Sequence, residues 1–224
     1  MFRKFIVLFI GSFLSIGFQA NGADVGLSPS SLKLAVYKVS VSTSPLCTNL
    51  MTVIDNGSTP SEVNFVGGVQ LGTGTIPIGV YPCIAIEFSD NIKFTPAANS
   101  TSGNCLASTE ETLDVCRSGN GDTSVLADGT VTTCTNGADR VAMYLSTASS
   151  QTTQADAFNP PTTLGDSTKG FNLGNALTVS GAASGKFIAN PAGQVCDGND
   201  SNCEGGGNPG TCNMGPPAFS FSQL

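Results

Sequence analysis

The chain has 224 residues, of which 16 are acidic, nine are basic and none is histidine, so its formal net charge is −7. Excess negative charge repels phosphate backbones and anionic lipid surfaces, which argues against nucleic acid as a partner. Because no imidazole is present, a hydrolase that activates Ser or Cys through His is also excluded.

The first 23 residues have the organisation of a secretory signal peptide. Arg3 and Lys4 form a basic start, an apolar run extends from Phe5 to Phe18, and small residues lead up to Ala23. The run is shorter than the roughly 20 residues that a membrane-spanning helix needs. We therefore expect cleavage before Ala23 or Asp24 and a mature chain without a membrane span. It would be secreted, periplasmic or on the outer cell surface, with 7 basic and 16 acidic side chains and a net charge of −9.

The mature chain opens with a strand whose apolar pattern changes phase. Apolar residues occupy the even positions from Leu32 to Val36 and the odd positions from Tyr37 to Val41. A change of phase turns side chains to the other face unless an extra residue is absorbed, so we expect a β-bulge near Val36 and Tyr37. Further strands are expected at residues 50–54 and from Val63 onward.

The clearest strand signal lies at residues 83–88. Pro82 has no backbone N–H to donate, so this strand should begin at a sheet edge or outside the ladder. Its two faces are expected to carry different residues, because side chains alternate along a strand: Ile84, Ile86 and Phe88 on one face, and Cys83, Ala85 and Glu87 on the other.

Residues 97–139 are poor in apolar side chains and contain three cysteines. This composition predicts an insertion held by disulfides, within an otherwise single β-sandwich domain over residues 24–224. Asp128-Gly129 predicts a hairpin turn inside the insertion. Alternating Val141, Met143 and Leu145 then predict a half-buried strand.

The last strand is expected from Ala218 to Leu224. Phe219 and Phe221 lie two positions apart and so point to one face, as in a strand packed on a core. The end of the chain should therefore be part of the fold, although a loop rich in Gly and Asn precedes it.

All eight cysteines lie in the expected mature chain, which predicts disulfides in an oxidising compartment. A zinc site is disfavoured because the chain has no histidine and no CxxC pair. Each of Cys47 and Cys83 begins a strand, so this pair is the first one we expect, followed by Cys196 with Cys203. The partners of the other four stay open: Cys105, Cys116, Cys134 and Cys212.

One loop has a weak resemblance to a calcium site. Asp197, Asn199, Ser201 and Glu204 offer oxygen ligands at spaced positions. Asn202 and Asn208 stand where a calcium loop has glycine and a carboxylate, so a polar loop tied by cysteines is the main alternative. No other metal and no cofactor is indicated.

A glycoside hydrolase would need two carboxylates across a sugar. The candidates are Glu87, Asp90, Glu110 and Glu111, although solvated charges on edges and loops are the favoured interpretation of all four.

Five segments resemble a group of exported bacterial proteins of uncharacterised function with a transthyretin-like (prealbumin-like) β-sandwich. They are SLKLAVYKVSVST, EVNF, LGTGTIPIGVYPCIAIEF, ALTVSGAASGKF and PPAFSFSQL, and the turn before the clearest strand is carried by Pro77, Gly79 and Tyr81. The resemblance covers residues 30–95 and 170–224. It implies an all-β, Greek-key sandwich of the transthyretin or immunoglobulin kind, and no catalytic residues.

Three functions fit these observations. The first is a non-enzymatic surface or envelope protein for binding, adhesion or structure, with a glycan or an envelope protein as partner. The second is a carbohydrate-active hydrolase with paired carboxylates, and the third is a fibre or pilus-like subunit. The ligand and the oligomeric state stay open.

Overall fold

The computed structural model describes residues 26–67, 74–116, 123–151, 156–180, 185–198 and 210–223. Within these ranges the chain forms strands, turns and loops but no helix, which confirms the all-β class. No helix able to cross a membrane occurs in the same ranges. The strands are β1 (Pro29–Ser42), β2 (Met51–Asp55), β3 (Glu62–Asn64), β4 (Gly79–Tyr81), β5 (Cys83–Ser89), β6 (Asn91–Pro96), β7 (Glu111–Asp114), β8 (Thr123–Val125), β9 (Val131–Thr133), β10 (Arg140–Ser146), β11 (Phe171–Asn172), β12 (Leu177–Val179), β13 (Gly185–Asn190), β14 (Val195–Asp197), β15 (Cys212–Met214) and β16 (Ala218–Gln223).

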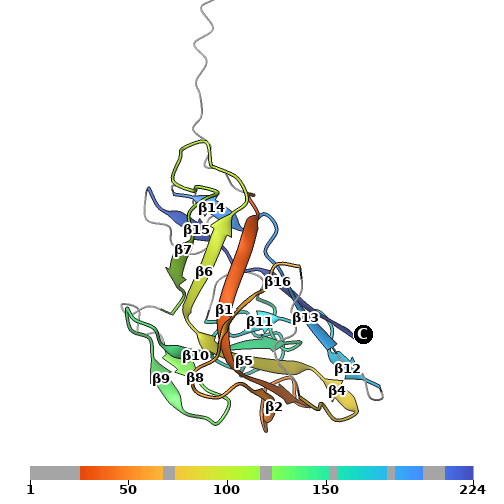
Figure 1. Ribbon diagram of the computed structural model, residues 1–224. Coiled ribbons are helices and arrows are strands. Elements are labelled where there is room, and N and C mark those ends of the chain that lie inside the picture. The colour runs from red at the N-terminus through yellow and green to blue at the C-terminus, as the bar shows by residue number, and fades with distance from the viewer. Residues whose placement is uncertain are drawn as a thin grey trace, which may run out of the picture.

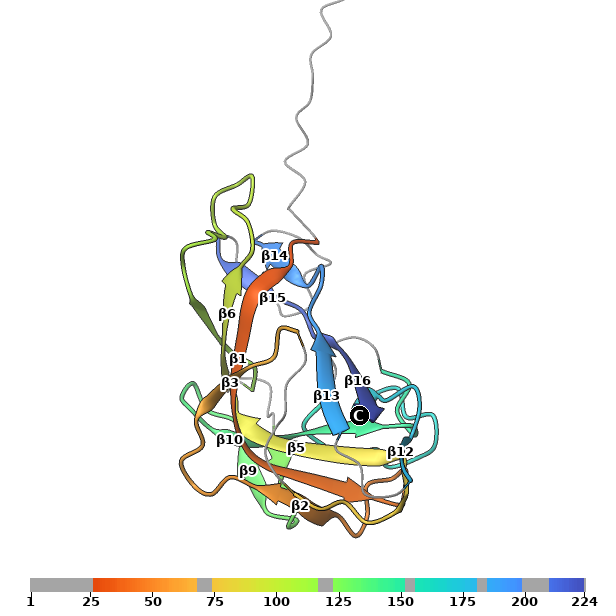
Figure 2. The same ribbon diagram turned by 45° about the vertical axis from the view of Figure 1, so that its right-hand side comes forward.

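An eight-stranded sheet organises the molecule, and β1 lies near its centre (Figure 1). Its main path runs β11-β10-β5-β1-β6-β7, with β2 and β3 also paired to β1. The N-terminal half of β1 pairs with β3 and β6, and its C-terminal half pairs with β2 and β5. Figure 2 shows β1 running down beside β6 and then turning to run beside β5, so the sheet curls around the core.

The phase change of β1 is a β-bulge at Tyr37. Val36 is paired with Phe88 of β5, whereas Lys38 is paired with the next residue along, Glu87, so the register shifts between them. Val36 and Val39 are three positions apart, so in a regular strand they would point to opposite faces. The extra residue lets both be buried. The predicted bulge is therefore confirmed.

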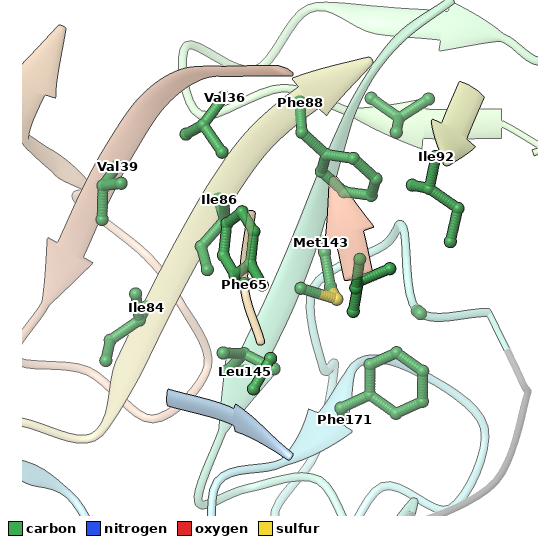
Figure 3. Packing of buried hydrophobic residues seen from close by; sticks show 14 of the residues in the cluster. Val36, Val39, Phe65, Ile84, Ile86, Phe88, Ile92, Met143, Leu145 and Phe171 are labelled. Atoms are coloured by element: carbon green, nitrogen blue, oxygen red, sulfur yellow. The ribbon is translucent and has the colours of Figure 1, made fainter. Parts of the chain in front are cut away.

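The main core lies on the inner side of the curled sheet (Figure 3). Ile84 and Ile86 of β5 lie beside Met143 and Leu145 of β10, and Phe65 packs over them. Each of these side chains is at most 6% exposed. Burial of apolar surface at this density is the main source of stability for such a sheet.

Strand β10 is covered on both faces, so the prediction of a half-buried strand is wrong. Ala142 and Tyr144, which point away from the main core, are 0% and 1% exposed. The hairpin of β8 and β9 covers them: Tyr144 Oη donates to Val125 O at 2.7 Å, and Ala142 N donates to Ser124 Oγ at 2.8 Å. The cover comes from residues distant in sequence, which the alternation of β10 alone does not indicate.

The segment 97–139 supplies three of the strands. Strand β7 pairs with β6 in the large sheet, and β8 pairs with β9. The turn of the second pair is the predicted one at Asp128-Gly129, where Leu126 N donates to Thr130 O at 2.8 Å and Gly129 has a φ of 86°. A positive φ suits glycine, so this prediction is confirmed.

The C-terminal strand is part of the fold, as predicted. Strand β16 pairs antiparallel with β13 from Asn190 opposite Ala218 to Gly185 opposite Gln223. Phe219 packs against the core, and its ring centroid lies 5.9 Å from that of Phe171. Leu224, the last residue of the predicted strand, lies outside the described residues.

Three disulfides join distant parts of the described chain. The predicted bridge between Cys47 and Cys83 is confirmed, with 5.3 Å between the Cα atoms. The other two bridges, whose partners the sequence left open, are Cys105–Cys212 and Cys116–Cys134. Cys196 is also disulfide-bonded, but Cys203 lies outside the described residues, so that predicted pair stays a prediction.

Candidate functional site

The loop between β6 and β7, residues 97–110, projects at one end of the molecule (Figure 1). We call it the β6–β7 loop. Most of its side chains are exposed, and Leu106 is 40% exposed. Two of its residues are buried instead: Ser100 is 7% exposed and Cys105 is 0% exposed. A loop that is polar outside and anchored inside suits recognition of a partner.

A buried carboxylate, that of Asp197 in β14, holds the β6–β7 loop in place. Asp197 is 2% exposed. Its Oδ2 accepts hydrogen bonds from Ser100 Oγ and, at 3.1 Å, from Asn104 N. Its Oδ1 accepts a hydrogen bond from Asn104 Nδ2 at 2.5 Å. One side chain therefore fixes two points of a loop that lies more than 90 residues away in sequence.

These hydrogen bonds decide the charge of Asp197. Burial alone would raise the pKa of its carboxyl. Hydrogen bonds from Ser100, Ser102 and Asn104 outweigh burial and lower that pKa. Asp197 is therefore an anion at neutral pH, held by hydrogen-bond donors of the loop.

Covalent and backbone bonds complete the anchoring. The Cys105–Cys212 disulfide ties the loop to β15. Ser100 N donates to Cys105 O at 2.9 Å, and Ala107 N donates to Asn99 Oδ1 at 2.8 Å. The loop thus presents its exposed residues on a backbone that is fixed at several positions.

Asp166, in the loop that precedes β11, is a second buried aspartate that holds a loop by accepting several hydrogen bonds. Its carboxylate accepts hydrogen bonds from both the amide and the hydroxyl of Thr162 and of Thr168, and from Lys169 N, at 2.8 to 3.2 Å. These donors hold the pKa of the Asp166 carboxyl well below its ordinary value. Buried aspartates therefore shape two separate surface loops.

The four calcium candidates are only partly covered by the described residues. Asn199, Ser201 and Glu204 lie outside them, so the calcium hypothesis for this loop stays a prediction. Asp197 is described, and both of its oxygens accept protein hydrogen bonds. No group of three metal-ligating side chains occurs among the residues that the structure describes.

Two of the candidate catalytic carboxylates have basic partners. Glu87 is 3% exposed, and its Oε2 accepts a hydrogen bond from Arg140 Nε at 2.8 Å, while its Oε1 accepts one from Ala127 N at 3.1 Å. Glu110 pairs with Lys33 across 2.5 Å at the surface. Basic side chains therefore engage both carboxylates, one in the interior and one at the surface.

The other two carboxylates lie in different settings. Asp90 is fully buried between β5 and β6, and Glu111 is the first residue of β7. The sequence did not predict the ion pair of Glu87, because Arg140 lies 53 positions further along the chain and no local pattern joins the two residues.

The architecture and the anchored loop define a disulfide-bonded, all-β protein with a fixed polar loop at one end. Comparison of the chain with protein-family models, with curated proteins and with solved structures finds no match in any of the three.

Proposed function

We propose that this chain is an exported, non-enzymatic β-sandwich protein of the cell envelope or surface, and that the β6–β7 loop binds a glycan or another envelope protein. The observation that carries the proposal is the anchoring of an exposed polar loop by Asp197 and by the Cys105–Cys212 disulfide. A loop that is fixed before binding loses less conformational entropy when its partner arrives. Its hydroxyl, amide and backbone groups are suited to hydrogen bonding with a polar partner.

The proposal includes a Greek-key sandwich similar to that of transthyretin. Antiparallel pairing between strands that are not consecutive supports it, since β1 lies between β5 and β6 and β5 lies next to β10. Such crossovers are typical of Greek-key folds.

An oxidising compartment agrees with the disulfides. Three disulfides within one domain are stable outside the cytosol, in the extracellular space or the periplasm. The expected signal peptide, residues 1–23, lies outside the described residues. Cell fractionation and mass spectrometry of the native protein test export directly. A mature N-terminus at Ala23 or Asp24 supports it, and an intact Met1 contradicts it.

Binding is tested with the mature protein on glycan arrays and by crosslinking to envelope fractions. The test variant is Thr101→Ala/Leu106→Ala/Ser108→Ala, which truncates exposed side chains of the β6–β7 loop. The matched control is Thr163→Ala/Leu164→Ala/Ser167→Ala, which makes the same changes in the exposed loop around Asp166. We expect the first variant to lose binding by about tenfold or more, since about 1.4 kcal/mol is enough for that factor. Equal binding by both variants contradicts the assignment of the loop.

A further inference from the structure

Asp90 connects three segments at the bend between β5 and β6. Its backbone N donates to Asp139 O at 3.0 Å, and its backbone O accepts from Val115 N at 3.1 Å. Its side-chain Oδ1 accepts from Asp139 N at 2.7 Å. One residue therefore joins the end of β7 to the start of β10, while the Cys116–Cys134 disulfide joins the residues after β7 to the end of β9.

The second carboxyl oxygen of Asp90 is buried without a hydrogen-bond partner. Asp90 is 0% exposed, and among the described residues Oδ2 has no such partner. An ionised carboxylate in this position would lose its hydration, and one amide donor on the other oxygen compensates only part of that loss. Geometry alone thus favours the protonated form.

The charged groups that face Asp90 in the described structure are both carboxylates. Asp114 stands at the end of β7, and Asp139 precedes β10. Each already accepts a hydrogen bond elsewhere: Asp114 Oδ1 from Cys116 N at 3.2 Å, and Asp139 Oδ2 from Thr135 Oγ1 at 2.7 Å. Two negative neighbours oppose a third negative charge between them.

These features agree with the titration behaviour of the group. Burial is the largest cause and raises the pKa of Asp90 to about 7. The amide of Asp139 acts in the opposite direction, and the charges of Asp114 and Asp139 raise the pKa further. The folded protein therefore holds a proton here that an unfolded chain releases near its ordinary value, 3.8.

We propose that Asp90 is a pH-sensitive latch, closed when its buried carboxyl is protonated and open when ionisation sets three carboxylates against one another. Opening separates Asp90 from Val115 and Asp139 and loosens residues 114–116 and 134–139, while β5 and β10 stay paired. Because the closed form holds the extra proton, raising the pH from the ordinary value of 3.8 up to the folded pKa weakens it, and no further loss follows above that pKa. The device is independent of the binding role of the β6–β7 loop.

Carbon-13 NMR of the aspartate carboxyls in the mature full-length protein tests the latch, with Asp90 assigned by its absence in Asp90→Asn. We expect a titration midpoint near pH 7. In the same protein, hydrogen exchange at Val115 and Asp139, corrected for the intrinsic rate, should lose protection by up to about tenfold per pH unit between the ordinary value of 3.8 and that midpoint, and should level off above it. Asp90→Asn should keep its protection, because an amide does not ionise.

Two further variants make the result decisive. Asp114→Asn removes one negative neighbour, so the midpoint of Asp90 should shift to lower pH even if Asp90→Asn folds poorly. Asp55→Asn, which changes an exposed carboxylate at the end of β2, should leave the midpoint unchanged. A midpoint near pH 4, or the same loss of protection in Asp90→Asn, overturns the proposal.

Discussion

Arg140 neutralises the buried carboxylate of Glu87 on the neighbouring strand: its Nε donates to Oε2 at 2.8 Å, and Nη2 donates to the same oxygen. The guanidinium also lies over the ring of Tyr37, 4.7 Å from its centroid. This pair is less exposed than the three other ion pairs of the described chain, since the Glu87 side chain is 4% exposed.

Arg140→Leu should lower the free energy of unfolding by about 3 kcal/mol, because it leaves the charge of Glu87 buried without a partner. Adding Glu87→Gln should recover a large part of this loss. The control is Lys93→Leu, which removes the exposed partner of Glu62 and should cost much less, because water screens an exposed ion pair. Urea unfolding of the four proteins measures the difference. Equal losses for Arg140→Leu and Lys93→Leu would contradict the structural role of the buried pair.

Removal of the Cys47–Cys83 disulfide should destabilise the fold by about 2 to 4 kcal/mol. The choice of replacement should matter, because Cys47 has a φ of 59°, where residues with a side chain are disfavoured. We expect Cys47→Gly/Cys83→Ala to be more stable than Cys47→Ala/Cys83→Ala by about 1 kcal/mol. Calorimetry of both variants tests this order, and the reverse order would show that the loop changes its backbone once the bridge is gone.

Asp197→Ala should destabilise the protein by about 2 kcal/mol near neutral pH, since it removes a charged acceptor from several buried donors. The pKa of this carboxyl is lowered in the folded state, so its contribution is present above the ordinary value of 3.8 and is lost as the pH falls through the folded value. The gap between wild type and variant should therefore shrink in acid. Urea titrations over a pH series measure it, and amide exchange at Asn104 should accelerate in the variant. A gap that is constant down to about pH 2 would contradict the assignment.

Phe219→Ala should lower the melting temperature by about 5 °C, from loss of about 2 kcal/mol at a partly buried aromatic side chain. The contact with Phe171 supplies part of this loss, and Val131→Ala, at a position 63% exposed, is the control. Deletion of residues 217–224 should lower the melting temperature further, because β13 loses its only partner strand in the described structure. Melting of the truncated protein within about two degrees of the full chain would remove β16 from the stable fold.

Structural features that depend on neighbouring residues could be predicted from the sequence. The phase change at Tyr37 predicts the bulge, Asp128-Gly129 predicts the hairpin, and the spacing of Phe219 and Phe221 predicts the last strand. Each follows from the period of two along a strand or from the φ preference of glycine.

Features that depend on distant residues could not be predicted in this way. The alternation in β10 indicates one buried face, whereas Ser124 and Val125 cover the other face. The anchoring of Ser100 by Asp197 joins positions 97 apart, and Arg140 reaches Glu87 from 53 positions away. Tertiary packing sets these pairs, and a single sequence gives no signal for them.

The position of β1 also bears on the order of events during synthesis. All of its partner strands, β2, β3, β5 and β6, end by Pro96, so they emerge from the ribosome soon after β1 itself. The Cys47–Cys83 bridge can close inside this early unit. Cys105, in contrast, must wait for a partner 107 positions later, while Cys116 and Cys134 emerge in between as competing thiols. The Cys105–Cys212 bridge therefore cannot form until residue 212 has emerged, and wherever Cys105 has first paired with another thiol, a disulfide isomerase would speed the exchange.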